Sequence, residues 1–204
     1  MGKKLFVTCG ATVPFPQLVE CIVSKQFTEL AANQFNYTEF VIQYGIGYTE
    51  SFEKLIHDIY GAEPIPVEDT CKYGCPRVGR YRLLDGKLLI HGLEYSSKIQ
   101  ELIQDSALVV SHAGTGSILD ALRSEGGKAG KPLIVVVNDT LMDNHQEQIA
   151  SRFESMGYIV SCHSSLGQLT LALASLEDGS QSLKPFPQAH NDGFARLLLE
   201  TSLH

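Results

Sequence analysis

Short apolar runs of strand length alternate along the chain with segments in which apolar residues recur at helical spacing. This alternation constrains the fold most, because it is typical of βα units that build a mainly parallel sheet. The expected strands are Lys4 to Cys9, Phe40 to Tyr44, Ala107 to Ser111, Leu133 to Val137 and Tyr158 to Cys162. The sequence therefore predicts an α/β fold with helices on both faces of the sheet.

The helical segments have apolar residues on one face. After the first strand we expect a single helix, whose apolar face carries Leu18, Val19, Ile22, Val23, Phe27 and Leu30. Further helices are expected at Tyr48 to Tyr60, Ser96 to Gln104, Ser117 to Arg123, His145 to Met156 and Leu166 to Leu176. Asp85-Gly86 stands between two apolar runs, which predicts a β-hairpin.

The 204 residues suffice for one domain with its own hydrophobic core. We expect that domain to span residues 1–177. Residues 178–193 are polar and rich in Pro, Gly and Ser, which is typical of a linker. Residues 194–204 carry Phe194, Leu197 and Leu198 at helical spacing and are expected to form a docking helix.

The charge balance restricts the classes of ligand. Sixteen Lys and Arg stand against 23 Asp and Glu, a formal charge of -7, with no basic block longer than Lys3-Lys4. A nucleic-acid-binding surface is therefore not expected. A ligand that carries phosphate has to be held locally, by backbone N–H groups and helix dipoles.

Sequence features also bear on compartment and metal binding. The longest purely apolar run, Leu133 to Val137, is far shorter than the ~20 residues of a membrane-spanning helix, and the first residues lack the apolar core of a signal peptide. We therefore expect a cytoplasmic protein. Its five cysteines, an odd number, are expected as free thiols. Cys71 and Cys75 lack a second Cys or His pair at zinc-finger spacing, so no metal site is expected. No cofactor is expected either.

Two expected strands end in small residues that let a ligand approach the backbone. Thr8-Cys9-Gly10-Ala11-Thr12 follows the first strand, where the alternative interpretation is a simple tight turn. Ser111-His112-Ala113-Gly114-Thr115-Gly116-Ser117 joins another strand to a helix. Its glycines and hydroxyls at a helix N-terminus suit a diphosphate, and the alternative is an ordinary capped helix. Leu119 occupies the position of the third glycine of the dinucleotide fingerprint, so that motif is absent.

A third cluster follows the expected strand Leu133 to Val137. It runs from Asn138 to Gln146 and contains Asp143, Asn144, His145 and Gln146, whose carboxylate and amide groups suit sugar hydroxyls. The alternative is a solvated loop in which Asp143 or Asn144 caps a helix. His112 and His145 are the candidates for a catalytic proton transfer. No G-x-S-x-G motif is present to support a serine hydrolase.

Read together, the three strand ends resemble the nucleotide-sugar-binding half of GT-B glycosyltransferases. More closely, the chain is similar to the catalytic-subunit family of the heterodimeric UDP-N-acetylglucosamine transferase that extends dolichol-linked GlcNAc. The likeness runs from the first strand through Lys184-Pro185-Phe186-Pro187 to the C-terminal residues. It implies a Rossmann-like domain equivalent to the donor-binding half of a GT-B enzyme.

The resemblance also implies a function and partners. The family transfers GlcNAc, with inversion, from UDP-GlcNAc to the lipid-linked acceptor GlcNAc-diphosphodolichol, the second step of N-glycan precursor assembly. The transfer takes place on the cytosolic face of the endoplasmic reticulum and requires a membrane-anchored partner subunit with the acceptor-side domain. It requires no metal.

The resemblance extends to the related bacterial enzyme of cell-wall lipid synthesis, and positions that match its motifs imply roles for individual residues of this chain. An acidic residue in the helix after its glycine loop holds the ribose, which implies that role for Asp120. A Gln-Gln pair there holds the sugar, and His145-Gln146 stands in its place with one Gln replaced. The implied donor site comprises Gly10, Ala11, Thr12, His112, Ala113, Gly114, Thr115, Gly116, Ser117, Asp120, Asp143, Asn144, His145 and Gln146.

Two other classes of function remain open at this point. The same loops could serve a non-catalytic nucleotide-sugar-binding regulatory module. A doubly wound nucleotide-dependent oxidoreductase is disfavoured by the missing fingerprint.

Overall fold

The computed structural model describes residues 2–123, 131–138 and 144–187, and of Asn144 and His145 the backbone only. Its strands are β1 (Lys3–Thr8), β2 (Tyr37–Gln43), β3 (Gly79–Leu83), β4 (Leu88–Leu93), β5 (Leu108–His112), β6 (Leu133–Val137) and β7 (Val160–His163). Its helices are α1 (Pro16–Val23), α2 (Lys25–Phe35), α3 (Thr49–Tyr60), α4 (Ile99–Asp105), α5 (Thr115–Arg123), α6 (Asn144–Ser155) and α7 (Leu166–Glu177), with a 3₁₀ turn at Cys71–Tyr73.

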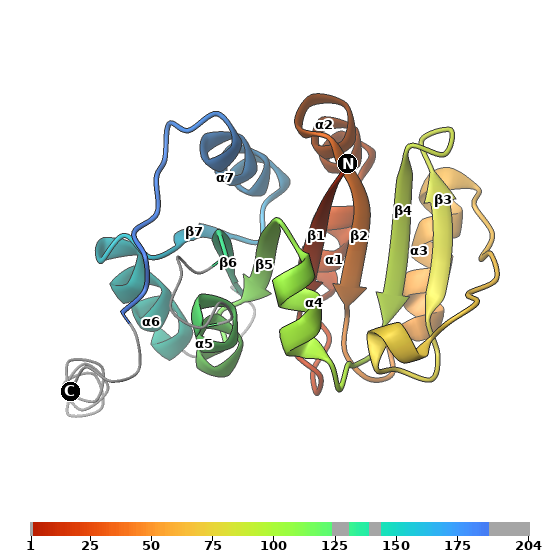
Figure 1. Ribbon diagram of the computed structural model, residues 1–204, viewed down its shortest axis with the longest axis horizontal. Coiled ribbons are helices and arrows are strands. Elements are labelled where there is room, and N and C mark those ends of the chain that lie inside the picture. Colours follow the sequence, from red (N-terminus) through yellow and green to blue (C-terminus); the bar gives the residue numbers. More distant parts are fainter. Residues whose placement is uncertain (1, 124–130, 139–143, 188–204) are drawn as a thin grey trace.

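The strands form one seven-stranded sheet in the order β3-β4-β2-β1-β5-β6-β7 (Figure 1). β3 runs antiparallel to β4, and every other pair of neighbours is parallel. Without β3, the order is the 3-2-1-4-5-6 arrangement of the Rossmann fold. The expected α/β, Rossmann-like sheet is confirmed.

Successive side chains of the central strands point to opposite faces of the sheet, so the hydrophobic core has two parts, one on each face. Leu5 and Val7 of β1 belong to an apolar cluster with α1, α2, α3 and α7, whereas Phe6 belongs to a cluster with α4, α5 and α6. Figure 1 shows α4 and α5 in front of the sheet and α1 and α3 behind it. Each fully buried side chain of this size stabilises the fold by ~1.5–3 kcal/mol.

The segment after β1 corrects one expectation. Instead of a single helix it forms α1 and α2, which meet at Ser24. Ser24 has an extended backbone (φ -60°, ψ 148°), and its side chain accepts a hydrogen bond from the Phe27 N–H at 3.3 Å. Because serine competes for helical backbone groups in this way, it begins a new helix inside a continuous apolar pattern.

The predicted hairpin is present as β3 and β4. Its connection is residues 84–87, longer than the two residues Asp85-Gly86, since the last strand pair is Leu83 with Leu88. Leu84, Asp85 and Gly86 in this connection all have positive φ. The hairpin adds the antiparallel edge strand to the otherwise parallel sheet.

Residues 178–187, the described part of the expected linker, contain no helix or strand. Leu183 packs against one core cluster, and the ring of Phe186 lies 5.1 Å from that of Tyr158. The domain boundaries stay a prediction, since the expected docking helix at 194–204 lies outside the described residues. No helix among the described residues is long and apolar enough to cross a bilayer.

Candidate donor site

The candidate site lies at the carboxyl edge of the sheet, where the strand order reverses. β1 is paired in parallel with both β2 and β5, and the chain leaves β1 and β5 in opposite directions along the sheet. Such a switch point is where open parallel sheets bind ligands. A pocket of about 240 Å³ lies there, lined by residues 9–15, His112, Asn138 and Gln146.

The loop after β1 forms one wall of this pocket. Gly10 has φ +84°, and a Cβ atom there would lie 3.1 Å from Cε1 of His112. Its N–H donates to Oγ1 of Thr8 at 3.2 Å. Ala11 and Thr12 follow as exposed residues at the pocket rim, so the loop presents small groups to an incoming ligand.

His112 forms the floor between the two glycine loops. Its Nδ1 lies 3.3 Å from the Thr8 carbonyl oxygen. Burial lowers the pKa of His112, although the Thr8 carbonyl opposes that effect. The imidazole is therefore neutral at pH 7, with Nδ1–H donating to Thr8 and Nε2 left as an acceptor.

The start of α5 provides backbone donors beside His112. Ile118 N–H donates to the Gly114 carbonyl at 3.0 Å, and the amides of residues 115–117 precede this bond without an intrahelical acceptor. Together with the positive end of the helix dipole, they favour an anion. Thr115, Gly116 and Ser117 are not among the residues that line the pocket itself.

The two glycines of this loop have different roles. A Cβ atom at Gly114 would lie 2.3 Å from Nε2 of His112, so the close approach of that ring requires glycine. A Cβ atom at Gly116 would meet nothing within 4 Å. Of the two, only Gly116 leaves space that a ligand can occupy.

The third strand end closes the pocket from α6. Gln146 is half-buried there, and its Oε1 is buried without a hydrogen-bond partner among the described residues. A buried acceptor left unpaired costs ~1–3 kcal/mol, so a ligand that donates to it is favoured. Asp143 lies outside the described residues, as do the side chains of Asn144 and His145, whose backbone begins α6.

Asp120 lies one turn along α5, outside the pocket lining. Its Oδ1 accepts a hydrogen bond from Nε2 of Gln100 on α4 at 3.0 Å. The ribose role implied for Asp120 stays a prediction.

Phe15 lines the pocket and was not predicted from the sequence, whereas Cys9 and Asn138 lay within the predicted strand-end clusters but outside the implied set of donor-site residues. Asn138 directly follows β6, and this position at the end of a strand is the sequence feature that indicates a place in the pocket. The buried Phe15 directly precedes α1 and belongs to the same apolar cluster as Cys9. Burial raises the pKa of Cys9 to about 12, so this thiol stays protonated and does not act as a nucleophile.

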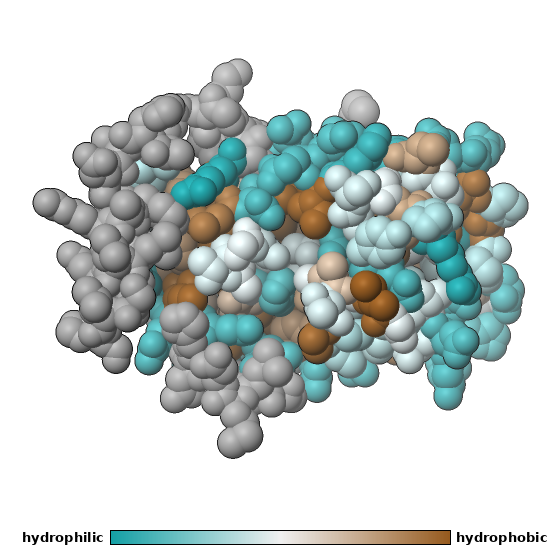
Figure 2. Space-filling model, turned by 90° about the horizontal axis from the view of Figure 1, so that it is seen from below, coloured by the Kyte–Doolittle hydropathy of each residue, from teal (hydrophilic) through white to brown (hydrophobic). Residues whose placement is uncertain are grey.

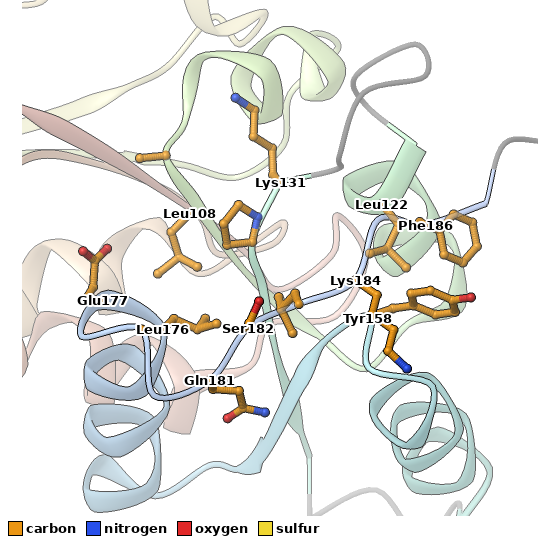
Figure 3. A pocket seen from close by; sticks show the side chains of 14 residues that line it. Leu108, Leu122, Lys131, Tyr158, Leu176, Glu177, Gln181, Ser182, Lys184 and Phe186 are labelled. Carbon is orange, nitrogen blue, oxygen red and sulfur yellow. The ribbon is translucent and has the colours of Figure 1, made fainter.

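A larger cavity of about 550 Å³ lies at the opposite, amino edge of β5 and β6 (Figure 3). Its walls are mostly apolar, including Leu108, Leu122 and Leu183. The C-terminal ends of α5 and α7 reach it, and the negative ends of their dipoles disfavour a phosphate. Glu177 at its rim is engaged by Lys3 and by the Tyr37 hydroxyl. Lys131 and Lys184 also line this larger cavity, but no helix begins among its lining residues, whereas the smaller pocket lies at the switch point beside the start of α5. The smaller pocket is for that reason the better candidate for a diphosphate.

All five cysteines are free thiols, with Cys71 exposed and Cys75 buried. Among the residues that the structure describes, no three His, Cys, Asp or Glu side chains are grouped so as to hold a metal ion.

Residues 4–200 match the model of the glycosyltransferase family 28 C-terminal domain. The chain belongs to this family. It is 47% identical to the UDP-N-acetylglucosamine transferase subunit ALG13 of Saccharomyces cerevisiae, over 98% of this chain and 96% of that protein. The solution structure of an ALG13 protein matches with a TM-score of 0.71 at 45% identity, covering 100% of this chain and 98% of that one.

A crystal structure of MurG from Acinetobacter baumannii shares the fold, with a TM-score of 0.57 at 14% identity. The match covers 86% of this chain but 41% of MurG. The family and the fold make this chain a Rossmann-like domain of the GT-B glycosyltransferase type, as expected from the sequence.

Proposed function

We propose that this chain is the donor-binding subunit of an inverting glycosyltransferase that uses UDP-GlcNAc. The observation that carries the proposal is the pocket at the switch point, which the Gly10 loop, His112 and Gln146 line, with the Oε1 of Gln146 unpaired among the described residues. The start of α5 follows His112 within three residues, next to this pocket. Family membership and the name of the 47% identical relative support the choice of donor.

In this proposal the diphosphate lies against the amides at the start of α5, and the sugar reaches Gln146. The amides and the α5 dipole then stabilise the charge that develops on UDP as the glycosidic bond to GlcNAc breaks. These groups are fixed by the fold before the ligand arrives, so little reorganisation is needed at the transition state. A neutral His112 beside this site can accept a hydrogen bond at Nε2.

The acceptor in this proposal is GlcNAc-diphosphodolichol, held by a membrane-anchored partner subunit on the cytosolic face of the endoplasmic reticulum. The word subunit in the relative's name and the match to only part of MurG support a second component. Its arrival would bring the acceptor hydroxyl to the carboxyl edge of the sheet. The general base is then supplied either by this chain, with His112 and His145 as candidates, or by the partner.

The test is transfer of radiolabelled GlcNAc from UDP-GlcNAc to GlcNAc-diphosphodolichol. We expect no transfer by the purified chain alone, and transfer when microsomes of Saccharomyces cerevisiae depleted of their own ALG13 subunit are added. Binding of UDP-GlcNAc without transfer under either condition would indicate a non-catalytic regulatory module instead.

A further inference from the structure

Three loops at the carboxyl edge of the sheet present large apolar side chains to solvent. Val13 follows β1, Ile46 follows β2 and Tyr95 follows β4, and these residues are 63%, 56% and 39% exposed. We call these three residues the apolar ridge. Figure 2 views the molecule from this edge and shows apolar side chains at its surface among polar ones.

The ridge is concentrated at this edge of the molecule. Among the described residues, one other large apolar side chain has comparable exposure, Leu171 on α7 at 70%. Side chains exposed to this degree add little to the stability of their own core. Apolar side chains gathered in adjoining loops typically mark an interaction site.

Hydrogen bonds join the three loops into one surface. The Ile46 N–H donates to the Ala11 carbonyl at 3.0 Å, and the Gly45 N–H donates to the Glu94 carbonyl at 3.1 Å. The Glu94 carboxylate accepts from the Gly47 N–H at 2.9 Å and from the Thr49 hydroxyl at 3.0 Å. Because the loops are already fixed, a partner that binds here loses little free energy to ordering them.

The ridge is continuous with the candidate donor pocket. Val13 belongs to both, since it lines the pocket and is also the most exposed residue of the ridge. A partner molecule that binds to the ridge therefore lies at the mouth of the pocket. In a transfer reaction, the second substrate has to arrive at that mouth.

We propose that the apolar ridge is a docking surface for an apolar patch on the polypeptide that carries the acceptor. This inference rests on the proposed function. A second copy of the chain fits less well, because it would place two donor pockets against each other without an acceptor. An anionic bilayer also fits less well, because the chain carries a formal charge of -7. Tyr95 suits a polypeptide partner, since tyrosine is enriched at the energetic centres of protein interfaces.

The test compares Ile46→Ser and Tyr95→Ser with Leu171→Ser, a control at an apolar residue that is more exposed than either and lies outside the ridge. Sedimentation would measure binding of each labelled chain to the ALG13-depleted microsomes. We expect the two ridge variants to raise the half-saturating concentration at least tenfold, with Leu171→Ser unchanged. UDP-GlcNAc affinity of the isolated chains should stay within twofold of the parent, because neither ridge variant lines the pocket.

Several results would overturn the inference. Unchanged binding of the ridge variants, an equal loss in Leu171→Ser, or a loss of UDP-GlcNAc affinity would each do so. Undiminished binding to protease-treated microsomes would assign the ridge to lipid, and a dimer lost in Ile46→Ser would assign it to a second copy. If binding depends on the ridge but no GlcNAc is transferred, the docking surface stands and the proposed function fails.

Discussion

At the scale of single residues, His112 determines much of the geometry of the candidate site. Its ring fills the space beside Gly114 and approaches Gly10, so both glycine loops are packed around it. Sequence reasoning placed both loops in one site because parallel strands end at a common edge. From the sequence, glycine at position 114 was expected to let a diphosphate approach the backbone. In the structure, glycine is required there because a Cβ atom would collide with the His112 ring. That ring contact is tertiary and has no signature in the spacing of the residues.

Gly116 offers a direct test of diphosphate binding. Gly116→Val fills space that is empty in the protein, so we expect UDP affinity to fall about tenfold or more while the melting temperature changes little. The matched control is Gly167→Val at the second residue of α7, where a Cβ atom also meets nothing within 4 Å. Titration calorimetry and thermal unfolding of both variants measure these effects. Parental UDP affinity in Gly116→Val would show that α5 does not receive the diphosphate.

Gln146 is expected to bind the sugar. Its buried, unpaired Oε1 is satisfied when a GlcNAc hydroxyl donates to it, a bond worth ~1 kcal/mol or more. Gln146→Ala should therefore weaken UDP-GlcNAc about five- to tenfold and leave UDP affinity nearly unchanged. Competition binding with the two ligands measures the difference. An equal loss for both would assign Gln146 to the nucleotide or to folding.

Among the helices and strands, the pattern of apolar residues predicted which elements exist, and whether each is a helix or a strand, better than it predicted where they begin and end. β6 was placed at its observed bounds, because Pro132 and Asn138 flank five apolar residues of which four are β-branched. The break at Ser24 was missed, because it depends on one side-chain cap inside an unbroken apolar stripe. The hydrogen bond between Asp120 and Gln100 depends on how α4 packs beside α5, which periodicity does not reveal.

The packing of β4 against the 3₁₀ turn predicts a pH dependence of stability. His91 on β4 stacks on Tyr73 with ring centroids 4.9 Å apart, and burial lowers the pKa of His91 to about 4. Glu39 opposes this shift, while Arg80, Lys72 and Lys4 reinforce it. In the unfolded chain the pKa returns to about 6.5, so the unfolded state binds the proton first as the pH falls.

The free energy of unfolding should therefore decrease as the pH falls from about 6.5 towards 4, by up to ~3 kcal/mol from this group. Urea unfolding of His91→Phe and of the parent at several pH values measures this contribution, which the variant should lack. His57→Phe is the control, because His57 is exposed on α3. Equal pH slopes in His91→Phe and the parent would contradict the assignment.

At the scale of the whole molecule, the chain has one Rossmann-like domain with a small pocket at one edge. A pocket of about 240 Å³ is below the ~300–1,000 Å³ typical of ligand sites. This is expected of a site that a second component completes. Composition and length predicted a single domain, but the position of the ridge depends on loops that only the fold brings together.

The C-terminal residues should contribute to association with that component. Deleting residues 190–204 removes the apolar residues Phe194, Leu197 and Leu198. We expect the truncated chain to lose sedimentation with microsomes and GlcNAc transfer, while UDP-GlcNAc binding in solution persists. Normal transfer by the truncated chain would exclude a docking role for these residues.

If UDP-GlcNAc binds at the switch point between β1 and β5, it changes the amide chemical shifts of the residues there. Titration of the ¹⁵N-labelled chain with UDP-GlcNAc, with and without a chelator, measures these changes. We expect chelator-insensitive changes that are largest at Gly10 to Thr12, His112 to Ser117 and Gln146. Changes centred on Leu108, Leu122 and Leu183 around the larger cavity, or a strict requirement for a divalent ion, would contradict binding at the switch point.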